Sequence, residues 1–365
     1  MRVIVLTQAY PSIEKPYNLA YVHTRVLEYQ KVCSELIVLC FDCHQSYEYQ
    51  GVMVSSEKDI VLQSYDVLVS HAPNLRNHIR WMLQNRTYWK KMVWVIHGHE
   101  VLIKQKYYPP AYPWLKKQSL VFSWLDYSYD LFKVRVLAYL IQKWLKQKSL
   151  HLIFVSQWMQ QAFLECVSIQ PDLMKPFASI VPNSLHPVFH QKKWDLSEPL
   201  ADFVTIRPLD SSKYAIDIVL KLALRWPNLK FDIYGEGNYF KHNVLPANVR
   251  HIARFLTQTE LPELLNHYRA ALLPTRLDAQ GVMACEIASY GMPLLTSDLP
   301  ICREMLSRFP HVAFFSMETL DIDLPAFLER SAQRRIEFPD VFSDHATIHK
   351  EIEIILQHAQ TDVFK

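Results

Sequence analysis

The feature of this sequence that most constrains its fold is a regular alternation of short apolar runs with longer amphipathic segments, which occurs twice along the chain. The short runs are rich in β-branched residues and are bounded by polar or turn residues, as is typical of buried parallel strands. The alternation predicts parallel sheets flanked by helices. The expected strands are RVIVLT, ELIVLC, DVLVSH, MVWVIH, HLIFVS and SIVP in the first half, and FVTIR, KFDIYG, VRHIA, AALLP, PLLTS and VAFFS in the second.

Residues 186–202 interrupt this alternation with a stretch that is rich in proline and charge and has no strand pattern. A chain of 365 residues is also longer than one core usually holds. We therefore predict an α/β protein with two doubly wound, Rossmann-like domains. The predicted boundaries are 1–190 for the first domain, 191–345 for the second, and 346–365 for a C-terminal helix that packs back toward the first.

The N-terminal residues show no signal-peptide pattern, and no apolar run approaches the roughly 20 residues that span a bilayer, so we expect a cytoplasmic protein. The six cysteines have no paired spacings, which predicts free thiols in a reducing compartment. Cys40, Cys43 and His44 spell C-x-x-C-H, a pattern that elsewhere attaches haem. Because they follow a strand-like run with no second ligand cluster, we interpret the two cysteines as thiols at a strand end.

Positive charge is concentrated in the first 190 residues, which hold 20 Lys and Arg against 13 Asp and Glu. Residues 76–91 and 131–150 each contain five basic residues and no acidic one, mixed with aromatic and aliphatic residues at helical spacing. This composition is typical of helices on anionic membrane surfaces, and equally of core helices with a solvated basic face. Nucleic acid is not an expected partner, because no binding motif accompanies the charge. On the membrane interpretation, Trp81, Trp89 and Trp144 lie at the lipid headgroups, and Arg76, Arg80, Lys143 and Lys146 supply charge.

Residues 270–298 are the most informative stretch. They predict a buried strand, a loop over 274–280, a helix that begins near Gly281 and a second strand near Pro293. A glycine at the start of the helix lets a ligand approach backbone amides, where the helix dipole favours a phosphate or a sugar oxygen. Asp278 on the loop and Glu286 in the helix can face one cleft.

This stretch resembles the signature of family 4 retaining glycosyltransferases, which have the GT-B fold. Pro274, Gly281, Glu286, Gly291 and Pro293 fall in register with that signature, and Asp278 occupies the place of its first glutamate. The substitution keeps the charge but shortens the side chain by one methylene. Val282 and Met283 stand where the family's backbone amides approach the donor.

Other segments extend the resemblance. Arg207 and Lys213, in FVTIRPLDSSKY, match the cations that clamp the donor diphosphate in the family. FDIYGEG resembles its strand followed by G-x-G, and HIARF the next strand. In the first half, MVWVIH resembles a strand that ends in a histidine near the donor sugar. The residues placed by these matches are Gly235 and Gly237, Arg254 and Phe255, and His97, with Asn18, His23 and Arg25 as polar candidates near the first strand.

The resemblance implies that the first domain meets the acceptor and the second holds a nucleoside-diphosphate sugar. Arg207 and Lys213 are expected to stabilise the diphosphate, Glu286 to hold the ribose, and Asp278 to hold the donor sugar. No metal and no cofactor are expected, because two basic side chains replace the metal. The expected partners are the nucleotide sugar, a saccharide or lipid-linked acceptor, and an anionic membrane surface on the cytoplasmic side.

Two other functions are compatible with these residues. A nucleotide-sugar epimerase shares the two-domain fold, but it turns over without an acceptor. A non-catalytic, membrane-associated scaffold derived from a transferase would explain the Asp278 substitution and the loop after the first strand, which lacks glycine. The intact set of Arg207, Lys213 and Glu286 argues against the scaffold.

Overall fold

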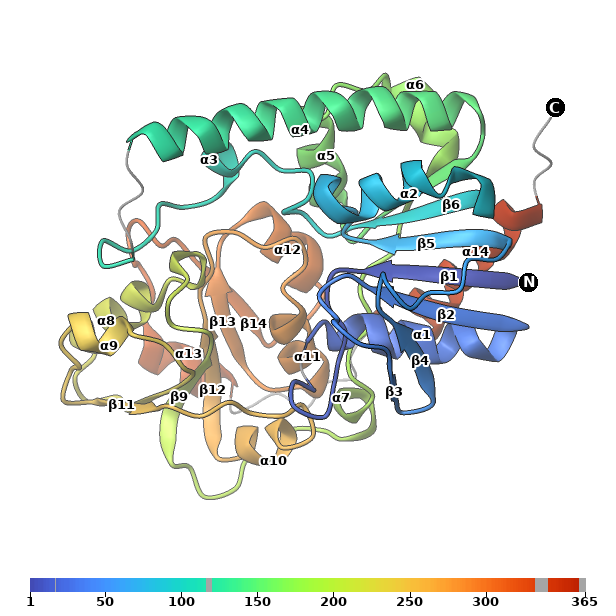
Figure 1. The fold of residues 1–365 in the computed structure, drawn as a ribbon. Helices are drawn as coiled ribbons and strands as arrows, with labels where there is room; N and C mark the ends of the chain where they lie inside the picture. The colour runs from blue at the N-terminus through green and yellow to red at the C-terminus, as the bar shows by residue number, and fades with distance from the viewer. Residues whose placement is uncertain (17, 116–119, 332–340, 361–365) are drawn as a thin grey trace. The chain divides into compact units, whose positions relative to one another are not determined.

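The computed structural model describes residues 1–16, 18–115, 120–331 and 341–360, which form two compact units (Figure 1). Unit 1 comprises Met1–Lys106, Ser123–Ser184 and Phe342–Lys365, and unit 2 comprises Tyr107–Phe122 and Leu185–Val341. The junction at 184/185 lies close to the predicted boundary at 190/191. Residues 107–122, which the prediction assigned to the first domain, group instead with unit 2.

Unit 1 is built on an eight-stranded sheet in the order β3-β4-β2-β1-β5-β6-β7-β8. All neighbours are parallel except β3 and β4, which form an antiparallel pair at one edge. These two short strands are the elements that the sequence pattern missed. The strands are β1 (Arg2–Thr7), β2 (Glu35–Cys40), β3 (Tyr47–Tyr49), β4 (Val52–Ser55), β5 (Tyr65–His71), β6 (Trp89–Ile96), β7 (Leu150–Phe154) and β8 (Ala178–Ile180).

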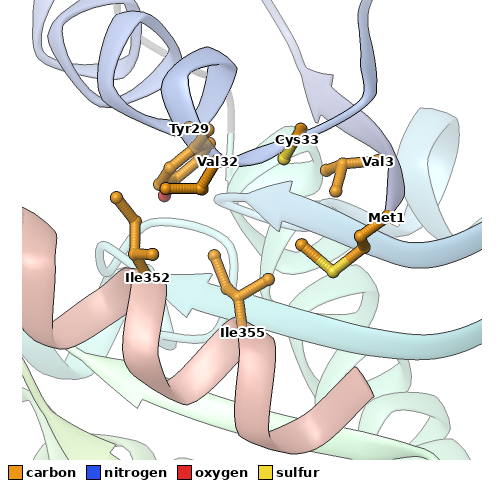
Figure 2. A pocket seen from close by; sticks show the side chains of 7 residues that line it. All are labelled: Met1, Val3, Tyr29, Val32, Cys33, Ile352 and Ile355. Carbon is orange, nitrogen blue, oxygen red and sulfur yellow. The ribbon is translucent and has the colours of Figure 1, made fainter. Parts of the chain in front are cut away.

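Helices flank this sheet, and the longest of them, α4, runs along the outer side of unit 1 past α5 and α6 (Figure 1). The last helix, α14, returns to the beginning of the chain: Figure 2 shows its Ile352 and Ile355 facing Val3 and Tyr29. Residues 361–365 of the predicted C-terminal helix lie outside the described residues. The helices are α1 (Ala20–Val32), α2 (Arg80–Gln84), α3 (Lys104–Tyr107), α4 (Leu120–Lys146), α5 (Gln157–Cys166), α6 (Pro171–Met174) and α14 (Lys350–Gln360).

Unit 2 contains a fully parallel six-stranded sheet in the order β11-β10-β9-β12-β13-β14. Phe203 and Phe231 stack on neighbouring strands, and Phe327 stacks on Phe203 from a helix. The strands are β9 (Ala201–Ile206), β10 (Phe231–Tyr234), β11 (Val249–Ile252), β12 (Tyr268–Leu273), β13 (Leu294–Ser297) and β14 (Val312–Phe315). The helices are α7 (Val188–Gln191), α8 (Ile216–Arg225), α9 (Tyr239–His242), α10 (Leu261–Leu265), α11 (Val282–Tyr290), α12 (Pro300–Leu306) and α13 (Leu324–Ser331).

The predicted fold class is confirmed, since each of the twelve expected apolar runs contains a strand. The expectation of six free thiols is wrong for two of them, because Cys40 and Cys43 form a disulfide at the end of β2. Cys33, Cys166, Cys285 and Cys302 are free. Among the described residues, no helix combines the length and the apolar character that crossing a membrane requires.

The tryptophans expected at lipid headgroups are core residues instead. Trp81, Trp89 and Trp144 are each 2% exposed. Trp144 makes edge-on ring contacts with Trp89 and with Trp94 on β6, at centroid distances of 6.4 and 5.4 Å. The membrane placement of the three tryptophans is therefore wrong: they fill the contact between helices and sheet in unit 1.

Candidate donor site in unit 2

The strand order of unit 2 reverses between β9 and β12, because the chain adds β10 and β11 on one side of β9 and β13 and β14 beyond β12. In open parallel sheets, ligands bind outside the carboxyl ends of the strands at such a switch point. Arg207 directly follows β9, and residues 274–281 follow β12. The fold thus brings the predicted diphosphate and sugar residues to one edge of one sheet.

Arg207 and Lys213 lie against the same aromatic ring. The guanidinium carbon of Arg207 is 5.0 Å from the ring centroid of Tyr214, and the Lys213 Nζ is 4.6 Å from it. Arg207 is 7% exposed, and its buried Nε has no hydrogen-bond partner among the described residues. A buried donor without an acceptor costs free energy. Within the described part of the chain, the two cations contact a neutral ring and form no ion pair with a carboxylate, so their charge is available to an anion.

The loop that carries Lys213 is fixed by Arg276, a residue that the sequence analysis missed. The Arg276 backbone N donates to the Lys213 carbonyl at 2.7 Å, and its guanidinium donates to the Ser212 carbonyl at 2.8 Å. The guanidinium also binds both carboxylate oxygens of Asp217, at 2.9 and 2.6 Å. These contacts tie the loop after β12 to the loop after β9. No local pattern pairs Arg276 with a carboxylate 59 positions away.

Gly235 and Gly237, which follow β10, allow loops to approach each other closely. A Cβ on Gly235 would lie 1.9 Å from the carbonyl oxygen of Arg207. A Cβ on Gly237 would lie 2.9 Å from the Cβ of Leu209. The two glycines thus position the strand-end loop that carries Arg207.

Gly281 starts α11 with a φ of +75°, in the left-handed region that favours glycine. Val282 and Met283 follow in the first turn and are half-buried. No side chain of the residues that the structure describes caps the helix N-terminus. Asp278 turns one carboxylate oxygen toward its own loop, where Oδ1 accepts from the amides of Ala279 at 2.9 Å and Gln280 at 3.4 Å. The second oxygen, Oδ2, lies on the side of Gly281.

Glu286 is 1% exposed in the second turn of α11 and is held by neutral donors. Its Oε1 accepts from Gln258 Nε2 at 3.0 Å and from the His186 backbone N at 3.4 Å. Burial raises the pKa of this carboxyl to about 8. His186 and Gln258 were missed from sequence because they lie 100 and 28 positions from Glu286, in stretches without a motif.

Arg254 and Phe255 are surface residues beyond β11. The Arg254 side chain is 57% exposed and pairs with Glu260, and Phe255 is 49% exposed. Their predicted role in lining the nucleotide pocket stays a prediction.

His97 belongs to unit 1 and directly follows β6. Its ring packs at a tilt against Tyr21 with a centroid distance of 4.9 Å, and its Nε2 lies 3.5 Å from His71 Nδ1. Burial and the nearby Arg25 charge lower the pKa of both histidines well below the ordinary value. Both imidazoles are therefore neutral at physiological pH.

Two of the three other polar candidates of unit 1, Arg25 and His23, make structural contacts, and the role predicted for Asn18 stays a prediction. Arg25 is fully buried and binds Glu351 of α14 through Nε at 2.9 Å and Asn183 through a second nitrogen at 3.0 Å. Glu351 also accepts from the Tyr29 hydroxyl. His23 bridges Tyr10 and Gln50 at 2.8 and 2.9 Å. The structure thus explains Arg25 and His23 by contacts within unit 1.

Comparison with known proteins gives the fold. No family model and no curated protein matches the chain. Among solved structures, HepE (Alr3699) of Anabaena in complex with UDP and glucose matches with a TM-score of 0.59 and 12% identity, over 99% of this chain and 98% of that one. The chain has the GT-B fold. The resemblance to family 4 glycosyltransferases is confirmed at the level of this fold.

Two further structures match over similar lengths. Sucrose-phosphate synthase from Thermosynechococcus elongatus has a TM-score of 0.59 and 10% identity, over 99% of this chain and 94% of that one. WaaG, a glycosyltransferase involved in lipopolysaccharide biosynthesis, has a TM-score of 0.55 and 12% identity, over 99% and 96%. At such low identities, the matches establish the GT-B architecture and leave the reaction to be argued from the site.

Proposed function

We propose that this protein is a retaining glycosyltransferase that moves a sugar from a nucleoside-diphosphate sugar to a hydroxyl of a saccharide or lipid-linked saccharide. The observation that carries the proposal is the pair of cations around Tyr214 at the switch point of unit 2, with the buried Arg207 Nε lacking an acceptor. A leaving diphosphate is an anion of suitable charge and position for this pair. HepE, which has the same fold, was solved with UDP and glucose.

In the proposed complex, Arg207 and Lys213 neutralise the charge that develops on the diphosphate as the glycosidic bond breaks. The amides at the start of α11, from Gly281 to Met283, add the positive end of the helix dipole. Arg276 keeps the two strand-end loops in register, so the donors are positioned before the substrate arrives. We propose that these groups supply the charge that a divalent metal supplies in other transferases.

Glu286 is proposed to accept hydrogen bonds from the ribose hydroxyls, and Asp278 Oδ2 from the hydroxyls of the donor sugar. Retention follows if the acceptor hydroxyl attacks from the face that the diphosphate leaves. A diphosphate oxygen then takes the proton of the attacking hydroxyl as the new bond forms. The predicted role of His97 near the donor sugar stays a prediction. A place in polysaccharide biosynthesis, in the cytoplasm and peripheral to the membrane, is part of the same proposal.

The decisive test is release of UDP from UDP-sugars, measured with and without saccharide and lipid-linked acceptors. Arg207→Ala is expected to lower kcat/KM by roughly 100-fold, as for loss of a preorganised charge contact. Lys213→Ala is expected to behave similarly, and the double variant to lose less than the product of the two effects. The matched control is Arg269→Ala, because Arg269 pairs with Asp202 at the opposite, amino-terminal end of β12 and β9.

Near-normal transfer by Arg207→Ala or Lys213→Ala would contradict the site assignment. Conversion of the donor without any acceptor would indicate an epimerase, and absence of UDP-sugar binding would indicate a scaffold. NMR of the product linkage tests retention, and transfer after treatment with a metal chelator tests metal independence.

A further inference from the structure

The long helix α4 exposes a second face that no part of the described chain covers. Its inner face packs on unit 1 through Val134, Leu137, Ile141, Trp144 and Leu145, which are all buried. Its outer face carries large apolar side chains that are well exposed: Trp124 at 66%, Phe132 at 57% and Tyr139 at 67%. Single exposed apolar residues need no explanation, but three aromatic residues on one helix face mark an interaction surface.

Exposed residues of this outer face, together with the half-buried Ser128, form one continuous stripe along the helix. Successive members are three or four positions apart, the spacing that aligns side chains on one side of an α-helix. The stripe consists of Trp124, Ser128, Phe132, Arg135, Tyr139, Lys143 and Lys146. It contains three cations and no carboxylate. Around the cations, the residues Arg135, Ala138, Tyr139, Gln142, Lys143, Lys146 and Ser168 line a shallow hollow of about 620 Å³.

The other basic stretch of unit 1 differs in how its charges are used. Arg80 binds both oxygens of Glu57 at 2.7 Å, and Lys90 pairs with Asp66 at 3.2 Å. Lys91 is 2% exposed. Of the two basic segments recognised in the sequence, the α4 stripe is therefore the one that combines exposed cations with exposed aromatic rings. This combination suits an anionic lipid surface, where rings enter the headgroup layer and cations meet phosphates.

We propose that the outer stripe of α4 docks unit 1 onto an anionic phospholipid surface, with Trp124, Phe132 and Tyr139 in the headgroup layer and Arg135, Lys143 and Lys146 on lipid phosphates. This docking stripe is independent of the proposed transfer reaction and gives the proposed peripheral membrane location a contact surface. Exposed residues of α4 take the place of the buried tryptophans that the sequence analysis assigned to the headgroups.

The test is co-sedimentation of the full chain with vesicles of phosphatidylcholine alone and of phosphatidylcholine with phosphatidylglycerol. Binding is expected on the anionic vesicles, and it should fall as salt rises because the cations are solvent-facing. Arg135→Glu/Lys143→Glu/Lys146→Glu is expected to lower the vesicle partition coefficient by at least 10-fold. Trp124→Ser/Phe132→Ser/Tyr139→Ser is expected to lower it by at least 3-fold. The control, Arg80→Glu/Lys90→Glu, changes the two cations that pair with carboxylates and should stay within 2-fold of the natural chain.

Circular dichroism melting curves of all variants are the folding control. Unchanged curves mean that a loss of vesicle binding is not caused by unfolding. Equal sedimentation with neutral and anionic vesicles at low salt would overturn the proposal, as would equal losses in the control and in the α4 variants. A second copy of the chain is the competing occupant of this stripe. If light scattering shows a dimer that the α4 variants convert to monomer while vesicle binding is unchanged, the stripe is a dimer interface and the proposal is wrong.

Discussion

Glu351 in unit 1 and Glu286 in unit 2 are both buried almost completely and are held in opposite ways. Glu351 in unit 1 is 0% exposed and binds the guanidinium of Arg25, which is equally buried. Although burial opposes its charge, the Arg25 pKa is raised, because Glu351 and neighbouring tyrosines stabilise the cation. Glu286 in unit 2 is 1% exposed, accepts hydrogen bonds from neutral donors and has a pKa raised to about 8.

The difference distinguishes a buried carboxylate that stabilises the fold from one that can take part in a candidate binding site. A buried carboxylate with its own cation is satisfied within the fold, and here it ties α14 to α1. A buried carboxylate with neutral donors keeps acceptor capacity and carries a desolvation cost, which a ligand with hydroxyl groups can offset. The same contrast applies to the arginines, since Arg25 is paired and the buried Arg207 Nε lacks an acceptor.

The largest predicted effect is that Glu286→Gln stabilises the protein at alkaline pH. The folded-state pKa of about 8 lies above the ordinary value of 4.5, so the folded protein keeps a proton that the unfolded chain releases. Stability that is present below pH 4.5 is therefore lost as pH rises through 8. We expect the variant to gain about 4 kcal/mol in unfolding free energy at pH 9 and nothing at pH 4. Urea unfolding at both pH values measures this difference, and an equal gain at pH 4 would contradict it.

Glu351→Gln is expected to do the reverse and destabilise unit 1 by about 3 kcal/mol at neutral pH, because it leaves Arg25 buried without an anion. The double variant Arg25→Met/Glu351→Leu removes both charges and is expected to recover much of the loss. Urea unfolding at pH 7 checks both expectations. If Glu351→Gln were as stable as the natural chain, the ion pair would not be the contact that holds α14.

A smaller effect is predicted for nucleotide affinity. If Glu286 accepts hydrogen bonds from the ribose, the ionised form binds better, so UDP affinity should rise between pH 7.5 and 9.5. The rise should be absent in Glu286→Gln, whose affinity at pH 9.5 is expected to be about 10-fold lower, or ~1.4 kcal/mol. Calorimetric titration measures it. Arg25→Met/Glu351→Leu is the control and should keep the pH dependence of UDP affinity. If Glu286→Gln showed the same rise in affinity as this control, the pH dependence would not come from Glu286.

The smallest effect is expected for Asp278→Asn. Asparagine Oδ1 can keep the hydrogen bonds to the amides of Ala279 and Gln280, so the loop should hold its shape. Loss of the second carboxylate oxygen is expected to lower sugar transfer about 5-fold, close to the net value of one hydrogen bond. UDP affinity should not change. Paired measurements of kcat/KM and UDP affinity test the assignment, and parallel losses in both would place Asp278 at the nucleotide instead.

Much of unit 2 could be predicted from short stretches of sequence, because its signals are local. An apolar run followed by Arg207 indicates a strand end, and Gly281 before the apolar segment of α11 indicates a left-handed residue at a helix start. Strand-and-helix alternation then places both at the carboxyl edge of one sheet. The partners of these residues could not be predicted. Gln258 reaches Glu286 from the loop before α10, and Arg276 reaches Asp217 on α8, through contacts that depend on the folded positions of distant loops.

The sequence by itself determined that the chain alternates strands and helices in two series and that residues 131–150 form a basic helix rich in aromatic residues. Only the tertiary structure decided which aromatic residues of unit 1 face inward. α4 is apolar on two sides, so its periodicity has no single direction, and packing against β6 buries Trp144 while Trp124 and Tyr139 stay exposed. The structure likewise decided that Arg25 is an internal ion-pair partner, because its carboxylate lies 326 positions away. The local sequence pattern determines which strands and helices form. The partner of a buried charge depends on the complete fold, because the fold brings distant residues together.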